Sequence, residues 1–223
     1  MKSKSSFVVS YYVIFYCLLL LVKSHASANY DLLVAMTDHY PPFEYIEDGS
    51  PRGISIEILN LILKKLDIEV SIRFMPWSRA YKIATTTPNT MLMTMSKTEE
   101  RDQYFEWVGP IYKTQVKVYR LQSRKNINLV DIDAAKNYRV GTVRGYASEK
   151  LLLSNGFSFG DNLFSASDSD INFQKLLGKR IDLLVSNDLT IVYLLKKYLI
   201  IIMPKLYLVA YLVAEVFSAL QML

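Results

Sequence analysis

Two hydroxyl side chains and an arginine fall close together in the segment TMSKTEER, as Thr94, Ser96 and Arg101. The run MLMTM predicts a strand over 91–95, and residues two apart on a strand share a face, so both hydroxyls are expected to point the same way. Thr98 is a suitable N-cap for a short helix that carries Arg101. Hydroxyls, the free N–H groups of a helix start and a guanidinium fork together suit a bound carboxylate.

The same residues allow a plainer interpretation, because turns rich in Ser and Thr between a strand and a helix are common. In that interpretation Arg101 pairs with a neighbouring glutamate on a solvated helix. The place of the segment in the predicted fold separates the two hypotheses.

Strands and helices are predicted to alternate around this segment. Apolar or alternating runs indicate strands over 31–36, 68–74 and 91–95. A first helix is expected between the first two strands, and a second from about Ser78 to just before Pro88. The apolar face of the first helix is expected to carry Ile54, Ile58, Leu61, Ile62 and Leu66.

This order predicts a parallel α/β sheet, in which ligands bind at the carboxyl ends of the strands. Four polar or aromatic residues follow such ends: Tyr40, Trp77, Thr94 and Ser96. Their agreement favours a binding site over a solvated helix.

A second α/β unit is predicted after the extended run 116–123. It has a strand over 138–143, a turn into a helix at RGYASEKLLL, a polar loop over 161–172 before another helix, and a strand over 180–186. Asn187 and Asp188 follow that last strand. Two such units can hold a ligand in the cleft between them.

The first 28 residues have the features of a secretory signal peptide. A basic start is followed by an apolar stretch over 7–22 and by Ala26-Ser27-Ala28, so cleavage is expected after Ala28 and the location is expected to be periplasmic. The alternative is a retained membrane anchor, which the shortness of the apolar run disfavours.

Composition excludes several classes of function. Removing the three lysines of the signal from the 26 basic residues leaves 23 against 21 acidic residues, with no basic stripe that would suit nucleic acid. The exported part has no cysteine and one histidine, His39, so no metal site, no histidine-based catalytic triad and no disulfide are expected. GTVRG lacks the spacing and lysine of a phosphate loop, and no cofactor is indicated.

The C-terminal segment 206–223 is apolar except for Glu215. A strand over 206–211 that returns to the first unit, followed by a short buried helix, is the preferred prediction. The alternative, a transmembrane helix, is disfavoured by the marginal length and by the acidic residue near the middle.

Taken in order, the motifs resemble those of the family 3 solute-binding proteins of bacterial ABC transporters, over about residues 30 to 205. The pairing of PWSRA with WVGPI is similar to one subgroup of that family. The motifs are YPPFEY (40–45), GISIEIL (53–59), PWSRAY (76–81), TMSKTEER (94–101), FEWVGPIY (105–112), YRVGTVRGY (138–146) and KRIDLLVSND (179–188).

The resemblance implies a two-lobed periplasmic binding protein type II fold, with a hinge of two crossover strands. Lobe 1 would comprise 29–115 plus 205–223, and lobe 2 would comprise 116–204. The implied function is capture of a small carboxylate-bearing solute, an amino acid or a related compound, for an inner-membrane ABC permease. A monomer without cofactor or nucleic-acid partner is expected.

The resemblance also implies roles for individual residues. Arg101 would bind an α-carboxylate with help from Thr94 and Ser96. Tyr40 and Trp77 would stack on the ligand from lobe 1. The lobe 2 residues expected to face the ligand are Arg144, Tyr146 and Asn187.

Three positions depart from the family pattern: Ser55 and Ala147 replace an expected Asp and Thr, and Asn187 stands where a carboxylate usually meets the ligand's ammonium group. An Asn offers an acceptor without charge. The ligand is therefore either an amino acid that is bound more weakly or an acid without an amine.

Two other functions fit the same fold. One is sensing of a ligand for a membrane signalling partner, which the sequence does not distinguish from transport. The other is an enzyme similar to cyclohexadienyl dehydratases, for which Glu44 is the candidate proton donor. No second catalytic partner accompanies Glu44, so a non-enzymatic function is predicted.

Overall fold

The computed structural model describes residues 33–202 and 208–211. The expected signal peptide over 1–28 and its cleavage after Ala28 lie outside these residues. None of the helices within the described ranges is long and apolar enough to span a membrane.

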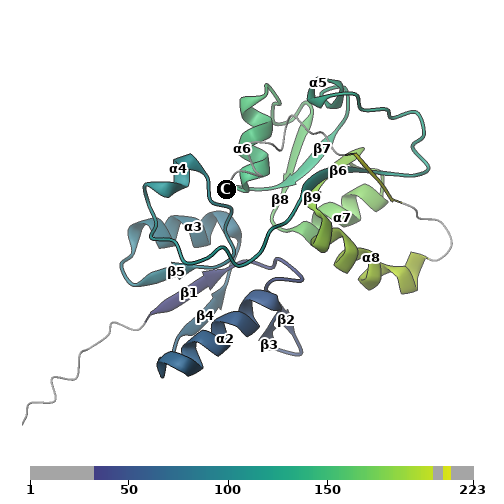
Figure 1. Ribbon diagram of the computed structural model, residues 1–223. Coiled ribbons are helices and arrows are strands. Elements are labelled where there is room, and N and C mark those ends of the chain that lie inside the picture. Colours follow the sequence, from purple (N-terminus) through teal and green to yellow (C-terminus); the bar gives the residue numbers. More distant parts are fainter. Residues whose placement is uncertain (1–32, 203–207, 212–223) are drawn as a thin grey trace, which may run out of the picture. The chain divides into compact units, whose positions relative to one another are not determined.

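A sheet of three parallel strands forms the first part of the fold, in the order β4-β1-β5 (Figure 1). Its strands are β1 (Val34–Thr37), β4 (Ser71–Phe74) and β5 (Thr90–Leu92). Helix α2 (Ile54–Leu66) connects β1 to β4, and α3 (Trp77–Thr86) connects β4 to β5. The predicted parallel α/β order is confirmed, and the crossovers bring the carboxyl ends of all three strands to one edge.

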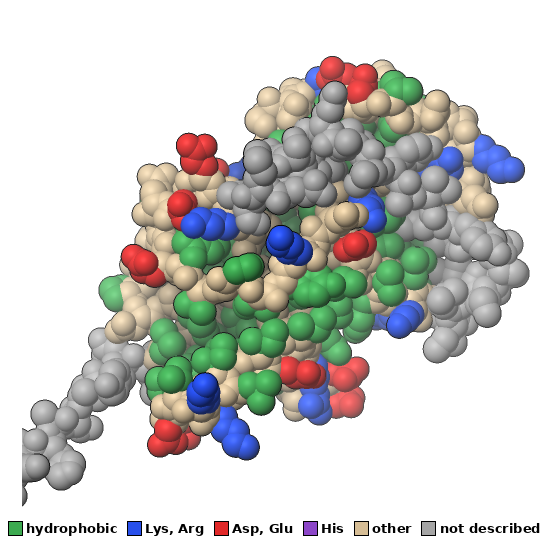
Figure 2. Space-filling model, in the orientation of Figure 1, with side chains coloured by type: hydrophobic (Ala, Val, Ile, Leu, Met, Phe, Trp, Pro, Cys, Tyr) green, Lys and Arg blue, Asp and Glu red, His purple; other side chains and the backbone are tan. Residues whose placement is uncertain are grey.

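Helix α2 packs through a different face from the expected one. Ser55, Ile56 and Leu59 are buried, and Leu63 packs on the same core as Ala35 and Met93. Three residues of the predicted face, Leu61, Ile62 and Leu66, are exposed. Figure 2 shows hydrophobic side chains at the surface on the side of the molecule that carries α2. Because this helix is apolar on most of its circumference, periodicity alone did not identify the packed face.

A turn and a hairpin precede α2. Residues 41–43 form the turn, which Tyr40 and Glu44 close with two backbone hydrogen bonds of 2.8 and 3.1 Å. The hairpin joins β2 (Tyr45–Glu47) to β3 (Ser50–Arg52) through Asp48 and Gly49, a residue pair typical of tight hairpin turns.

Gly53 allows α2 to start directly against the turn. Its φ is 120°, and a Cβ at this position would lie 2.2 Å from the carbonyl oxygen of Phe43. The N–H of Ile54 donates to Pro42 O at 3.0 Å, and the N–H of Ser55 donates to Phe43 O at 2.9 Å. The free N–H groups of the helix therefore hold the turn in place.

The strand predicted over 91–95 ends at Leu92. Thr94 has a φ of 37°, in the left-handed region that β-branched residues rarely adopt, so regular strand alternation does not continue to Ser96. The short helix α4 (Glu99–Asp102) then begins at the predicted N-cap, Thr98, whose side chain accepts a hydrogen bond from the Arg101 N–H. This N-cap prediction is confirmed.

The second sheet has five strands in the order β10-β6-β9-β7-β8. Its strands are β6 (Val116–Leu121), β7 (Val140–Val143), β8 (Leu163–Ala166), β9 (Leu183–Asn187) and β10 (Leu208–Tyr211). The helices of this part are α5 (Ile132–Ala135), α6 (Ala147–Ser154), α7 (Ser169–Leu177) and α8 (Asp188–Ile202). Two apolar clusters pack around the sheet, one including Leu163 and Leu183 and the other Phe173 and Leu194.

Strands β7, β8 and β9 are parallel, and β6 runs antiparallel to β9. The carboxyl ends of the three parallel strands and the start of β6 thus meet at one edge, where Val116 pairs with Asn187. The segment 161–172, predicted as a loop, contains β8.

Strand β10 differs from the expectation for the C-terminal segment. A strand was predicted over 206–211, and one is present over Leu208–Tyr211, but it pairs antiparallel with β6 in the second sheet and not with the first unit. The pairing is physically favourable because it satisfies the backbone groups of β6 that face away from β9. Residues 212–223 lie outside the described part, so the assignment of 205–223 as a whole to lobe 1 stays a prediction.

Candidate functional site

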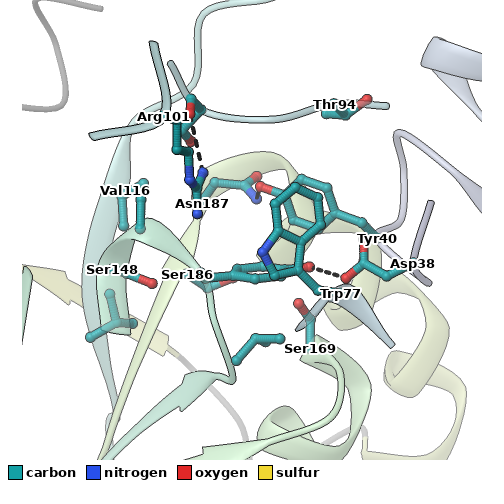
Figure 3. Close-up of a pocket in the computed structure, with 15 residues that line it drawn as sticks. Asp38, Tyr40, Trp77, Thr94, Arg101, Val116, Ser148, Ser169, Ser186 and Asn187 are labelled. Atoms are coloured by element: carbon teal, nitrogen blue, oxygen red, sulfur yellow. Dashed lines mark hydrogen bonds between the residues drawn. The ribbon is translucent and has the colours of Figure 1, made fainter. Parts of the chain in front are cut away.

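A pocket lies where the carboxyl ends of strands from both sheets meet (Figure 3). From the first sheet and the loops that follow its strands come Asp38, Tyr40, Trp77, Thr94, Ser96 and Arg101. The second sheet and the helix starts beside it contribute Val116, Val143, Tyr146, Ala147, Ser148, Ser169, Val185, Ser186 and Asn187.

Arg101 supplies a buried positive charge to this pocket. Its side chain is 2% exposed, and its guanidinium donates to the carbonyl oxygens of Ser96 and Gly145, both at 3.1 Å. The guanidinium carbon also lies 5.4 Å from the centre of the Trp77 ring. Burial lowers the pKa of Arg101 from its ordinary value, but a guanidinium remains charged in proteins.

No ion pair of Arg101 is present within residues 33–202. The plainer interpretation, a pair with a neighbouring glutamate on a solvated helix, is therefore wrong. The hydrogen-bond partners of the Arg101 guanidinium within the described residues are neutral carbonyl oxygens, so this buried cation has capacity left for an anion.

Asp38 supplies a buried negative charge to the same pocket. It directly follows β1, and its Oδ2 accepts a hydrogen bond of 2.6 Å from the Tyr146 hydroxyl, which Figure 3 shows as a dashed line. Burial raises the pKa of the Asp38 carboxyl to about 6, and the hydrogen bond from Tyr146 opposes this shift. Asp38 is not among the site residues predicted from the sequence, although an acidic residue at the end of a parallel strand is an available signal.

Tyr40 and Asn187 join the two sheets across the pocket. The Asn187 Nδ2 donates to the Tyr40 hydroxyl at 2.6 Å and to Thr190 Oγ1 at 2.8 Å, while its Oδ1 accepts from the Thr190 N–H at 2.8 Å. Asn187 therefore caps the start of α8 as well as lining the pocket. Its neighbour Asp188 begins α8 and does not line the pocket.

Thr94 connects the pocket to a second buried carboxyl group. Its Oγ1 lies 2.8 Å from Glu44 Oε2 and 2.6 Å from Ser55 Oγ, whereas the buried Glu44 Oε1 makes no hydrogen bond within the described part of the chain. Burial raises the pKa of the Glu44 carboxyl to about 8, against the hydrogen bond from Thr94, which lowers it. Glu44 is fully buried and does not itself line the pocket.

Seven of the eight predicted site residues line the pocket: Tyr40, Trp77, Thr94, Ser96, Arg101, Tyr146 and Asn187. Arg144 does not. Its side chain is exposed, because the chain leaves β7 at Val143 and only Gly145 and Tyr146 turn toward the first sheet. We therefore leave Arg144 out of the proposed site.

The pocket presents hydrogen-bond donors, one cation, one buried acid and aromatic rings. Within the described ranges, no group of three or more His, Cys, Asp or Glu side chains is placed to hold a metal ion. The arrangement suits a small polar solute with an acidic group and is typical of binding proteins whose sites lie between two α/β units.

The two sheets, their helices and the site between strand ends define a periplasmic binding protein of the type II fold. Residues 32–204 match the bacterial extracellular solute-binding proteins, family 3, and the chain belongs to this family. The predicted family and fold class are confirmed.

Among curated proteins, the chain is similar to the L-glutamate/L-aspartate-binding protein of Pseudomonas aeruginosa. The two are 28% identical over 147 residues, which covers 60% of this chain. The match spans 48% of that relative, about half its length.

Among solved structures, similar folds include an ancestral arginine-binding protein bound to arginine, with a TM-score of 0.69 and 18% identity over 86% of this chain and 91% of that one. A histidine kinase sensor domain has a TM-score of 0.70 and 18% identity, over 80% and 75% of the two chains. The substrate-binding protein of an amino acid ABC transporter has a TM-score of 0.67 and 21% identity, over 83% and 80%. At these identities the likeness concerns the fold.

Proposed function

We propose that this chain is a periplasmic solute-binding protein that captures a small carboxylate-bearing solute, an amino acid or a related compound, for an ABC permease. The observation that carries the proposal is Arg101, a buried cation beside the pocket whose described partners are neutral carbonyl oxygens. A carboxylate would neutralise it and accept two parallel hydrogen bonds.

The other end of the solute would meet Asp38 in this proposal. Asn187 has no charge and already uses its amide to cap α8 and to reach Tyr40. Asp38 is a carboxyl group in the pocket wall and can accept from an ammonium or guanidinium group of the solute. Of the two ligands left open by the sequence, an amino acid is thus the better supported.

The rings of Tyr40 and Trp77 and the hydroxyls of Thr94 and Ser96 would complete the contacts from the first lobe, with Tyr146 and Asn187 on the second. The proposed lobes follow the two sheets, with 29–115 and 116–204 as their main parts. The matched family consists of binding proteins, and Glu44 lies behind Thr94 and outside the pocket wall, which favours capture without chemistry.

Calorimetric titration of the purified protein with L-glutamate, L-aspartate, L-arginine and L-glutamine tests this function. The expected result is that the protein binds amino acids of one kind, whether acidic, basic or neutral, and that Arg101→Ala no longer binds them. Binding that is unchanged in Arg101→Ala would refute the site. A thermal-shift screen of other amino acids and organic acids extends the panel, since a ligand at a hundred times its Kd stabilises by about 2.7 kcal/mol.

A second candidate function is solute sensing for a membrane signalling partner, and the likeness in fold to a histidine kinase sensor domain favours it. Deletion of the gene separates the two functions. Loss of uptake of the bound solute indicates transport, whereas normal uptake with a lost transcriptional response indicates sensing.

A further inference from the structure

The loop between β7 and α6, which belongs to the second lobe, accepts hydrogen bonds from side chains of the first lobe. The carbonyl oxygen of Gly145 accepts hydrogen bonds from Trp77 Nε1 at 2.9 Å and from the Arg101 guanidinium at 3.1 Å. Two donors of the first lobe therefore converge on a single oxygen atom of the second. This is the environment that the proposed function assigns to a carboxylate oxygen of the solute.

Tyr146, the next residue, binds the negatively charged residue of the pocket, Asp38. Its hydroxyl donates to Asp38 at 2.6 Å, and its ring meets Tyr40 and Trp77 edge-on, with centroids 5.5 and 5.7 Å apart. Gly145 and Tyr146 together thus present an acceptor to Arg101 and a donor to Asp38. A solute with an acid at one end and an ammonium group at the other would offer the same pair of groups.

The loop is held in this shape by its own lobe. Gly145 has a φ of 78°, and its N–H donates to Glu149 Oε2 at 2.6 Å. Glu149 is buried on α6 and also accepts from the Ser165 hydroxyl of β8. A Cβ on residue 145 would lie 3.1 Å from Trp77 Cδ1, so glycine allows the carbonyl to approach the indole closely.

The loop occupies the hydrogen-bonding positions that the proposed function assigns to a solute. Gly145 O lies 3.1 Å from the Arg101 guanidinium, and the Tyr146 hydroxyl lies 2.6 Å from Asp38. A solute that takes over these two hydrogen bonds has to displace the loop from Arg101 and Asp38.

We propose that Gly145 and Tyr146 act as a tethered competitor of the solute, bonded to its two anchoring residues and holding the lobes together when no solute is bound. The proposal rests on the proposed function for the roles of Arg101 and Asp38. A tethered group competes at a high effective concentration, so the apparent affinity for the solute is the intrinsic affinity multiplied by the fraction of molecules in which the loop is withdrawn. The competed ligand is a solute with a hydrogen-bond acceptor at one end and a donor at the other.

Small-angle X-ray scattering and tryptophan fluorescence on the solute-free protein test whether the loop holds the lobes together. The wild type is expected to be compact. Tyr146→Ala is expected to have a larger radius of gyration and a red-shifted emission, because Trp77 loses contact with the loop. Tyr146→Phe keeps the ring but loses the hydrogen bond to Asp38. Its radius of gyration and emission wavelength are expected to lie between those of the wild type and Tyr146→Ala.

Tyr104→Ala is the matched control, since Tyr104 is 55% exposed and lies outside the pocket wall. It is expected to scatter and emit like the wild type, and circular dichroism verifies that every variant is folded. Identical scattering and emission of solute-free wild type and folded Tyr146→Ala would overturn the proposal. No solute enters this experiment, so its outcome is independent of whether any of the tested amino acids binds.

Discussion

At the scale of single residues, the pocket places opposite charges in one buried space. Arg101 is bonded to neutral oxygens, and Asp38 to a phenol. Neither charge is neutralised by the other through an ion pair in the described residues. Buried charges without a partner are unfavourable, and a zwitterionic solute would supply both missing partners at once.

Replacement of Arg101 by alanine is predicted to weaken solute binding strongly. Truncating one partner of a buried, hydrogen-bonded charge pair costs about 2–5 kcal/mol, or roughly 30-fold to several thousand-fold in Kd. Calorimetric titration with the amino acid that binds the wild type measures the loss. Arg144→Ala is the control, because Arg144 is exposed and outside the pocket wall, and its Kd should stay within about twofold of the wild type. Equal losses in both variants would contradict the assignment of Arg101.

Glu44 is predicted to make the protein less stable as the pH rises. Its pKa is raised from 4.5 to about 8 in the folded state, so between these values the folded protein binds more protons than the unfolded chain. Stability that is present below pH 4.5 is therefore lost as the pH rises through 8, by about 1.4 kcal/mol for each unit of pKa shift.

Urea unfolding at pH 6.5 and 8.5 measures this effect, with Glu44→Gln as the comparison. The raised pKa of Asp38 also lowers stability as the pH rises, but mainly up to about pH 6. The lowered pKa of His39 changes stability mainly below pH 6.5. The change in stability between pH 6.5 and 8.5 is therefore assigned to Glu44. The wild type should lose more stability across this interval than the glutamine variant. Parallel losses in the two proteins would show that Glu44 is not the group responsible.

At the scale of elements, the turn over 41–43 decides where several pocket residues lie. The start of α2 donates to Pro42 O and Phe43 O, and this close approach depends on Gly53. The turn is flanked by Tyr40 and Glu44, of which one lines the pocket and the other bonds to Thr94. A glycine outside the pocket therefore sets the geometry within it.

Gly53→Ala is predicted to destabilise the protein more than Gly49→Ala. Both positions have positive φ, which costs an L-residue about 1–3 kcal/mol. At Gly49 the added Cβ would meet nothing within 4 Å, whereas at Gly53 it would lie 2.2 Å from a backbone oxygen. Urea unfolding of the two variants should give the larger loss for Gly53→Ala, together with weakened solute binding. Equal destabilisation of the two would mean that the contact with Phe43 does not matter.

At the scale of the whole described molecule, the two sheets are joined by contacts of unequal strength. Buried bonds connect Asn187 to Tyr40 and the Thr190 hydroxyl to Pro41 O at 2.8 Å. An ion pair between Glu100 of α4 and Lys150 of α6 also joins the two parts, but both side chains are about half exposed. Water and salt screen such an exposed pair, so the buried bonds should dominate.

A double-mutant cycle on Glu100→Gln and Lys150→Met is predicted to give a coupling energy below about 1 kcal/mol, which falls further at high salt. Thermal unfolding of the four proteins at low and high salt measures it. The double variant serves as the internal control for changes within each lobe. A coupling of several kcal/mol that resists salt would contradict the prediction.

Much of the fold could be predicted because its signals are local. The alternation of strands and helices, the Thr98 cap and the position of polar residues after strand ends all depend on neighbours in the chain. Three of the predictions that failed did so where distant contacts decide. The packed face of α2 depends on the sheet beneath it, the partner of β10 on the free edge of β6, and the early end of β5 on the contact of Thr94 with Glu44 and Ser55.

The sequence by itself determined the family, the α/β class and seven of the fifteen residues of the pocket wall, because family motifs and strand ends are read along the chain. Only the tertiary structure revealed that Asp38 and Arg101 line one pocket, that Arg144 points to solvent, and that Gly145 and Tyr146 bind the donors and acceptor of the other sheet. The contact of Arg101 with Gly145 joins residues that are 44 positions apart in the chain, and the contact of Tyr146 with Asp38 joins residues that are 108 positions apart. No local pattern specifies which side chains meet across such a separation, since that is set by how the two sheets pack.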